Sequence, residues 1–360
     1  MDNKPLSDFS GQPKLSAPEN EIARERALSA VESGRRSAGA AETNDSIVAL
    51  PQSVPAPSPQ CESPLRDVFL GPTGVYPGTR WLVYLAMALV VFQVEGWLVV
   101  SLRSQLNVLW SRMMIEAGMM LAAILPGFAM ARIENRPFGS FGLPARYAFG
   151  RNFWVGTLWG TVSLSVLMLV LRVSGAFELG SPSLHGARIL KFAAYYAVFF
   201  LFTSFFEDFL MRGYSQWVLS QGMHFWPAAA LLSFAFGYIH VSNAGESATG
   251  LIATGLIGFF LCLTLRRTGD LWWAVGFHMA WDWGETYLYS VPDSGAVLPG
   301  HLFNSSLRGP DWLTGGSVGP EGSYLVFVVI GALWVAFDRA YPTVKYGLRI
   351  EGVSTRPGAA

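Results

Sequence analysis

Long apolar segments alternate with short polar connections over most of the chain. Eight of these segments have lengths near the twenty or so residues that a helix needs to cross a bilayer. The pattern therefore predicts an all-α, polytopic membrane helix bundle with about eight transmembrane helices. The expected spans cover residues 80–102, 113–131, 153–173, 189–219, 226–241, 249–265, 271–289 and 324–337.

The two ends of the chain differ from this central part. Residues 1–70 are rich in Ser, Ala, Pro, Glu and Arg, a composition that cannot bury enough apolar surface to fold, so a disordered polar tail is expected there. We expect a transmembrane domain over residues 80–340 and a C-terminal cytoplasmic tail over residues 341–360.

Composition supports a membrane protein. The chain is 51% hydrophobic and only 14% charged, which is too apolar for an ordinary soluble domain. Its net charge is zero, so no general attraction to nucleic acid is implied, and the partner that composition indicates is the lipid bilayer. The two cysteines, Cys61 and Cys262, indicate neither a disulfide framework nor a thiolate metal site.

Arginine and lysine gather in alternate connections between the spans. Cytoplasmic connections carry an excess of these residues, so the distribution predicts that both termini are cytoplasmic. The positively charged connections contain Arg132, Arg136, Arg146 and Arg151, then Arg266 and Arg267, and finally Arg339, Lys345 and Arg349.

The fourth span contains charged residues that an apolar helix does not need. Such residues inside a membrane are a functional hypothesis by default. Asp208 and Arg212 are four residues apart with the acid first, which favours an ion pair with a structural role. Glu207 points about 100° away from Asp208 and has no charged partner nearby in sequence.

Two histidines and a further acid lie in later apolar spans. Glu207 precedes the turn at residues 222–226 by about as many residues as His240 follows it, so an antiparallel helix pair brings the two to a similar height. His278 and Asp282 share one face of the seventh span. We therefore predict a shared polar site formed by Glu207, His240, His278 and Asp282.

The chemistry open to this set is hydrolysis. Glu207 in an apolar pocket suits a general base that activates water, with help from His240, and His278 with Asp282 could donate to an oxyanion. Zn²⁺ bound by Glu207, His240 and His278 is the competing arrangement, because two histidines and a carboxylate with an open fourth position form a catalytic zinc set. The sequence has no H-E-x-x-H motif.

Other polar and aromatic residues in the spans have simpler interpretations. Glu116 lies near a span end, where a local pair with Arg112 accounts for it. Glycines in the sixth span are typical of close helix packing. Tryptophans usually anchor a membrane protein at the interfaces. The tryptophans concerned include Trp272, Trp273, Trp281 and Trp283.

Three short motifs together resemble a known family. They read E-D-x-x-x-R at residues 207–212, F-x-x-x-H at 236–240 and H-x-x-x-D at 278–282. This series resembles the CPBP family of intramembrane proteases, also called the CAAX amino-terminal protease or Abi family, which includes the type II CAAX prenyl endopeptidases. The resemblance covers about residues 110–290, the expected protease core.

The resemblance implies a role for each site residue. It makes Glu207 the catalytic carboxylate, His240 its partner on the attacking water, and His278 and Asp282 the groups that stabilise the oxyanion or orient the substrate. A glutamate mechanism and a metalloprotease mechanism both remain open. Asp208 stands where the family usually has Glu, and Asp282 where the prenyl-processing members often have Asn, so the resemblance does not establish that the substrate is prenylated.

The expected function is thus an intramembrane CAAX-type protease of a bacterial inner membrane. The alternative is a catalytically silent scaffold or bacteriocin-immunity-type protein on the same fold, since some members of the family have such roles. A proton-coupled transporter is a third interpretation, but the chain shows no matching halves of the kind that transporters use.

Overall fold

The computed structural model describes residues 70–71, 74–102, 104–243 and 245–347. The predicted disordered tail lies outside the described residues apart from its last position, Leu70, and so does the predicted C-terminal tail from residue 348 onward.

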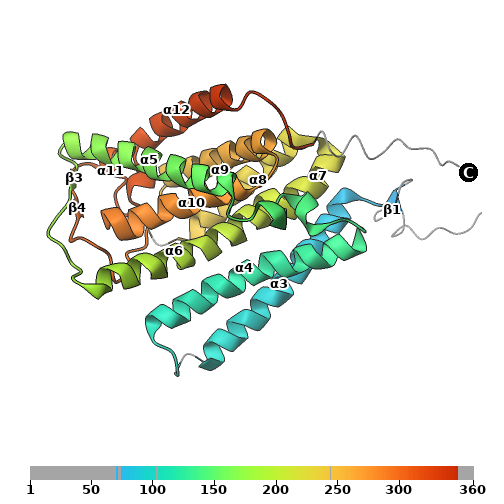
Figure 1. The fold of residues 1–360 in the computed structure, drawn as a ribbon, viewed down its shortest axis with the longest axis horizontal. Helices are drawn as coiled ribbons and strands as arrows, with labels where there is room; N and C mark the ends of the chain where they lie inside the picture. The colour runs from blue at the N-terminus through green and yellow to red at the C-terminus, as the bar shows by residue number, and fades with distance from the viewer. Residues whose placement is uncertain (1–69, 72–73, 103, 244, 348–360) are drawn as a thin grey trace, which may run out of the picture. The chain divides into compact units, whose positions relative to one another are not determined.

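The described chain is almost entirely helical (Figure 1), which confirms the predicted all-α class. Two short antiparallel strand pairs, β1 (Leu70–Gly71) with β2 (Gly74–Val75) and β3 (Phe177–Glu178) with β4 (Ser306–Leu307), are its only sheets. Two segments are π-helical, η3 (Phe209–Tyr214) and η5 (Gly284–Tyr289). The short 3₁₀ turns are η1 (Phe138–Phe141), η2 (Ala145–Tyr147), η4 (His240–Ser242) and η6 (Pro320–Gly322). The α-helices are α3 (Pro77–Leu102), α4 (Val108–Ile133), α5 (Arg151–Val173), α6 (Ala187–Asp208), α7 (Ser215–Met223), α8 (Phe225–Ile239), α9 (Ala248–Thr268), α10 (Trp272–Trp283), α11 (Asp311–Thr314) and α12 (Leu325–Ala340).

Each predicted span overlaps one of the long helical segments. In the described part of the chain, six segments are long and apolar enough to cross a membrane: α3, α4, α5, α6 with η3 and α7, α8 with η4, and α9. The seventh and eighth expected spans correspond to α10 and α12, which have only 12 and 16 residues. The number of crossings therefore stays a prediction.

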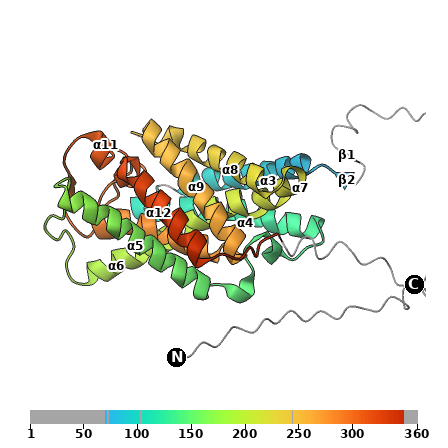
Figure 2. The same cartoon turned by 90° about the horizontal axis from the view of Figure 1, so that it is seen from above.

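The connections and helix ends form two separate sets, and the members of each set contact one another. In one set, β3 pairs with β4, and Ser317 donates a hydrogen bond to the Gly245 carbonyl. In the other, Arg80 pairs with Glu134 at 2.6 Å, and the Arg266 guanidinium donates to the Tyr346 carbonyl. The two sets lie at opposite ends of the helices (Figure 2), as expected when successive spans run in alternating directions.

Helix α10 occupies the centre of the bundle, with α5 on one side and α6 on the other (Figure 1). Nine of its twelve residues are buried. Trp272, Trp273 and Trp281 are among them, so the expectation that these tryptophans lie at membrane interfaces is wrong. They pack in the core because α10 is covered by neighbouring helices on nearly every side.

Small residues allow α5 to approach α10 closely. A Cβ atom added to Gly156 would lie 2.0 Å from the Trp273 carbonyl oxygen, and one on Gly276 would lie 2.2 Å from the Phe153 carbonyl oxygen. Both clashes are with backbone, which cannot rotate away. The position of α10, and of every side chain on it, therefore depends on the absence of side chains at this contact.

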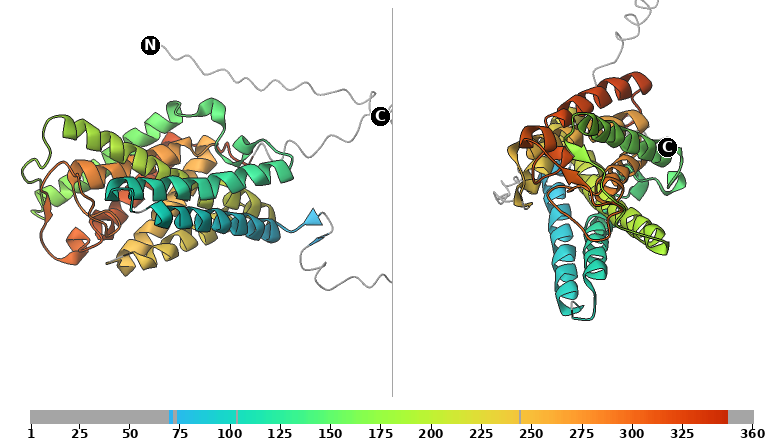
Figure 3. Two further views of the ribbon diagram at one scale, coloured as in Figure 1. Left: turned by 90° about the horizontal axis from the view of Figure 1, so that it is seen from below. Right: turned by 90° about the vertical axis from the view of Figure 1, so that its left-hand side faces the viewer.

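Helices α3 and α4 form a second pair (Figure 3), and α4 packs in turn against α6. In α3 only Tyr84 and Ala88 are buried, so this helix contributes little to the core. Helix α4 is more extensively covered and forms one wall around the end of α6, where the charged residues lie.

We predict that Gly156→Ala lowers the unfolding temperature of the detergent-solubilised protein. Alanine is favoured over glycine in a helix by about 1 kcal/mol, but forcing α5 away from α10 costs about 1–3 kcal/mol in a packed core. Thermal unfolding followed by circular dichroism measures the net effect. Gly96→Ala in α3 is the matched control, because no atom lies within 4 Å of its added Cβ, and it should be neutral or stabilising. Equal unfolding temperatures for both variants would contradict the close packing described.

Candidate active site

The acidic pair ends α6, and the chain continues directly as the π-helix η3. Gly213 in η3 has non-helical backbone angles (φ −83°, ψ −112°). A Cβ atom there would lie 2.6 Å from the buried Phe209 ring, so only glycine fits against that ring. The resulting break separates α6 from α7 and widens the helix at the level of the charged residues. Wide turns of this kind are frequent at functional sites.

Asp208 and Arg212 form a buried ion pair. The Arg212 Nη1 to Asp208 Oδ1 distance is 2.5 Å, and the two side chains are 1% and 0% exposed. The Arg212 Nε also donates to the Gly258 carbonyl oxygen at 3.1 Å, and its guanidinium lies 4.7 Å from the centre of the Phe236 ring. Arg212 thereby links η3 to both α8 and α9.

His278 on α10 lies among three carboxylates. Its Nε2 is 3.4 Å from both Glu207 Oε2 and Asp282 Oδ2. Its Nδ1 is 3.6 Å from Asp208 Oδ2. The second oxygen of the ion-paired aspartate thus faces the imidazole, which lies between the acids of α6 and the acid one turn further along α10.

His240 lies at the end of α8, in the 3₁₀ turn η4. Its Nδ1 is 2.7 Å from the Phe236 carbonyl oxygen, so the Nε2 atom is left to face the cavity. The Phe236 ring lies 4.9 Å from the imidazole in an edge-to-face arrangement and contacts Arg212 on the other side. The two residues of the F-x-x-x-H motif are therefore connected to the buried ion pair.

A cavity of about 410 Å³ collects the four predicted catalytic residues. Glu207, His240, His278 and Asp282 all line it, together with apolar side chains that include Phe199, Phe200, Phe277 and Trp281. Asp208 and Arg212 do not line it; they lie behind it. The residues that line the cavity but lie near helix ends or in connections are Arg112, Asn243, residues 293–296, Leu298 and Glu321.

Glu116 is a cavity residue that the sequence analysis undervalued. It accepts a hydrogen bond from Thr203 at 2.9 Å and lines the same cavity as Glu207. Its nearest predicted partner, Arg112, makes no ion pair within the described residues. One feature of the sequence could have placed Glu116 in the cavity: Thr203 shares a helix face with Glu207, and its hydroxyl can donate to a neighbouring helix.

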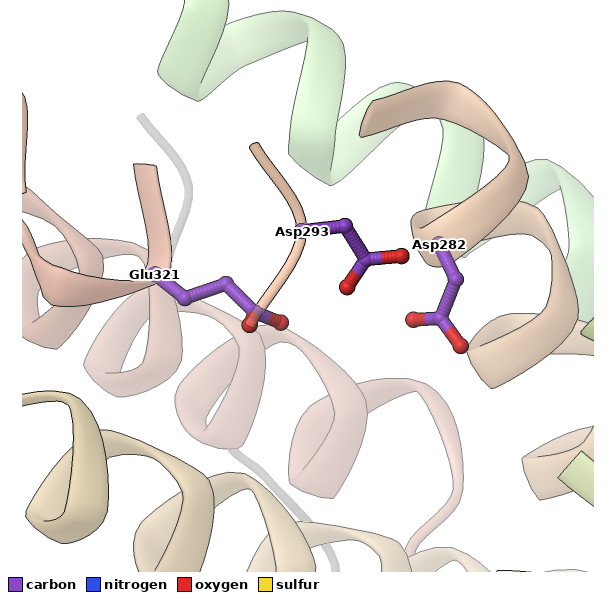
Figure 4. A group of neighbouring side chains, drawn as sticks. All are labelled: Asp282, Asp293 and Glu321. Carbon is purple, nitrogen blue, oxygen red and sulfur yellow. The ribbon is translucent and has the colours of Figure 1, made fainter. Parts of the chain in front are cut away.

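Two further acids, Asp293 and Glu321, also line the cavity and were not predicted, because they lie in a connection without periodicity. Figure 4 shows their carboxylates beside that of Asp282. Thr286 donates to Asp293 at 3.0 Å and Ser294 donates to Glu321 at 2.9 Å. Removal from water raises the pKa of Asp293, and the charges of Asp282 and Glu321 raise it further.

The side chains proposed for zinc do not form a ready ligand set. Within the described part of the chain, the one group of His, Cys, Asp and Glu whose ligand atoms lie within 4.8 Å of one another is Asp282, Asp293 and Glu321. It contains neither Glu207 nor the two histidines. Zinc also prefers nitrogen and sulfur ligands over three carboxylates. We therefore derive no catalytic step through a zinc ion.

Comparison with protein-family models finds one match, over residues 189–284, to the family described as type II CAAX prenyl endopeptidase Rce1-like. Residues 189–284, here called the Rce1-like domain, are therefore similar to this family. This confirms the family resemblance inferred from the three motifs. No curated protein and no solved structure matches the chain.

The Rce1-like domain runs from the start of α6 to the end of α10 and includes all six predicted site residues. Arg112, Glu116, Asp293 and Glu321 lie outside it, so the cavity is completed by segments on either side of the domain. Together with six helices long and apolar enough to span a membrane, the match identifies the chain as an integral membrane protein.

We predict that Asp208→Asn strongly destabilises the protein. Removing one member of a buried ion pair leaves the other charge uncompensated, at a cost of about 3–5 kcal/mol. The matched control is Asp338→Asn, which breaks the pair of Asp338 with Arg267 at the surface, where the aspartate is 55% exposed and such pairs contribute about 0–1 kcal/mol. Chemical unfolding in mixed micelles compares the two. Similar losses in both variants would show that the buried pair has no special role.

Proposed function

We propose that the chain is an intramembrane endopeptidase that hydrolyses peptide bonds of a membrane-associated protein or peptide. The observation that carries this proposal is the convergence of Glu207, His278 and Asp282, with His240, on one cavity that is mostly apolar. The Rce1-like domain supports protease activity and makes CAAX-type sequences the first candidates for a substrate. A bacterial inner membrane is the proposed location.

In the proposed mechanism Glu207 is the general base. It is 17% exposed and lines the cavity, so a water molecule can reach its free oxygen. Glu207 would take a proton from this water as the oxygen attacks the peptide carbonyl carbon, and His240 would orient the water from the opposite wall.

His278 and Asp282 would act on the other side of the reacting carbonyl. A tetrahedral intermediate places negative charge on the carbonyl oxygen, which needs a hydrogen-bond donor. The His278 Nε2 lies 3.4 Å from both Glu207 and Asp282, so the ring can hold a proton between the two acids and deliver it to the oxyanion or the leaving amine. Asp282 then orients this ring.

The cavity would open on the extracytoplasmic side. Its outer residues are Arg112, Asn243, residues 293–296, Leu298 and Glu321, which all belong to the connections poor in Arg and Lys or to the helix ends next to them. The arginine-rich connections lie at the opposite end of the helices. Under the positive-inside rule, substrates would approach from outside the cytoplasm.

The test compares new protein N-termini in membranes of a deletion host that carries either the wild type or Glu207→Gln at matched expression. Glutamine keeps the shape of the side chain and removes the base, so we expect cleavages made by the wild type to fall at least about a hundredfold, as is usual when a general base is lost. Glu178→Gln, a change of an exposed carboxylate on β3, should leave them intact.

Identical N-terminal profiles for the wild type and Glu207→Gln would overturn the protease proposal. A biological phenotype that persists in Glu207→Gln under those conditions would favour the scaffold or immunity function. A substrate found in the wild type alone identifies the cleavage sequence directly, and shows whether it carries a CAAX motif.

A further inference from the structure

Three carboxylates meet on one wall of the cavity, and two of them, Asp293 and Glu321, have no part in the proposed reaction, while Asp282 only orients His278 there. Asp282 comes from α10, Asp293 from the segment that follows η5, and Glu321 from η6. One oxygen of each lies within 4.8 Å of the others. Three segments distant in sequence thus bring acids to a single point, and like charges at this spacing repel one another.

The Asp282 carboxylate is buried without a hydrogen-bond donor among the described residues. It is only 9% exposed, and its carboxylate points toward Asp293 and Glu321 (Figure 4). It accepts no hydrogen bond from any described residue, and its ion-pair contact within the described part of the chain is with the His278 Nε2, at 3.4 Å from Oδ2. Asp293 and Glu321 each receive one hydroxyl donor, from Thr286 and Ser294, but neither donor serves Asp282.

Glu285 adds a second, independent observation. It is fully buried one turn after Asp282, and neither of its oxygens has a hydrogen-bond partner among the described residues. No Lys or Arg of the described chain pairs with any of these four acids.

We propose that Asp282, Asp293 and Glu321 bind a hard divalent cation of the Ca²⁺ class. The donors are all carboxylate oxygens, which Ca²⁺ and similar cations prefer. Two oxygens on one ion are separated by at most twice the metal–oxygen distance, about 5 Å for Ca²⁺ and about 4 Å for Mg²⁺. The observed spacing of up to 4.8 Å accepts Ca²⁺ without rearrangement, whereas Mg²⁺ needs the group to contract.

The bound ion would fasten the outer wall of the cavity to α10. The segments that carry Asp293 and Glu321 are already joined to each other, by Gly295 N–H donating to the Val318 carbonyl and by Ser294 donating to Glu321. Among the described side chains, Asp282 is the α10 carboxylate that faces both. An ion at this point therefore sets the position of the wall relative to His278, which lies one turn before Asp282.

Terbium luminescence tests this site without any measurement of proteolysis. The full chain in detergent is treated with EDTA, exchanged into buffer without metal and titrated with Tb³⁺, a luminescent substitute for Ca²⁺ that neighbouring tryptophans excite. Trp281 adjoins Asp282 and lines the same cavity. We expect saturable emission that Ca²⁺ displaces. Binding should weaken at least tenfold in Asp293→Asn and in Glu321→Gln, and remain unchanged in Asp311→Asn, an exposed acid of the same connection.

Two results would overturn the cation site. One is a wild type without emission that Ca²⁺ displaces, and the other is equal titration curves for the wild type and the two site variants. A measurement on the wild type alone avoids any folding defect of a variant: Ca²⁺ should raise its unfolding temperature above that in EDTA, and Na⁺ at equal ionic strength should not. No such rise also overturns the site. Because the readout is binding, Glu207→Gln should bind Tb³⁺ normally even if the protease proposal fails.

Discussion

The arrangement of the site depends on one desolvated charge pair, Asp208 with Arg212. An arginine that is 1% exposed inside a helix bundle is tolerated only where all of its surroundings compensate for the lost water. Here an aspartate, a backbone carbonyl of α9 and the face of Phe236 on α8 do so. The same contacts fix the relative positions of the helices that bear Glu207 and His240, while the free oxygen of Asp208 faces His278. The pair lies behind the cavity and determines the geometry of its lining.

The site depends on contacts both within one helix and between helices, and only the first kind could be predicted from the sequence pattern. The eight apolar segments have boundaries that match the observed helical segments within a few residues, when η3 and α7 are counted with α6, and η5 with α10. Hydropathy predicts them well because it reports directly on what a bilayer or a core accepts. The Asp208–Arg212 spacing and the His278–Asp282 spacing likewise reveal contacts within one helix. Contacts between different helices could be predicted only from the family motifs. Nothing in the periodicity of α8 indicates that Phe236 covers Arg212, although the family resemblance places the two residues on neighbouring spans.

The features that escaped prediction share a physical cause. Trp272, Trp273 and Trp281 belong to a helix that is surrounded on all sides, and burial of that degree cannot be distinguished from membrane exposure by apolar composition alone. Asp293 and Glu321 lie in an irregular connection whose path is set by tertiary contacts, so their approach to Asp282 leaves no local pattern. Glu116 was assigned to its own helix partner, whereas a hydroxyl on α6 is its actual donor. The cavity is therefore more acidic than the motifs alone indicate.

The π-helix after Asp208 sets the direction in which α7 faces. A π-turn holds one more residue than an α-turn, and its wider winding absorbs that residue without rotating the helix that follows. If residues 209–214 were wound as an α-helix at the same length, everything beyond them would rotate by about 100° relative to α6. Trp217, which is buried, would then leave the core while Glu207 and Asp208 stayed in place. The π-helical winding therefore lets one continuous segment direct the acids of α6 toward the cavity and the indole of α7 into the core.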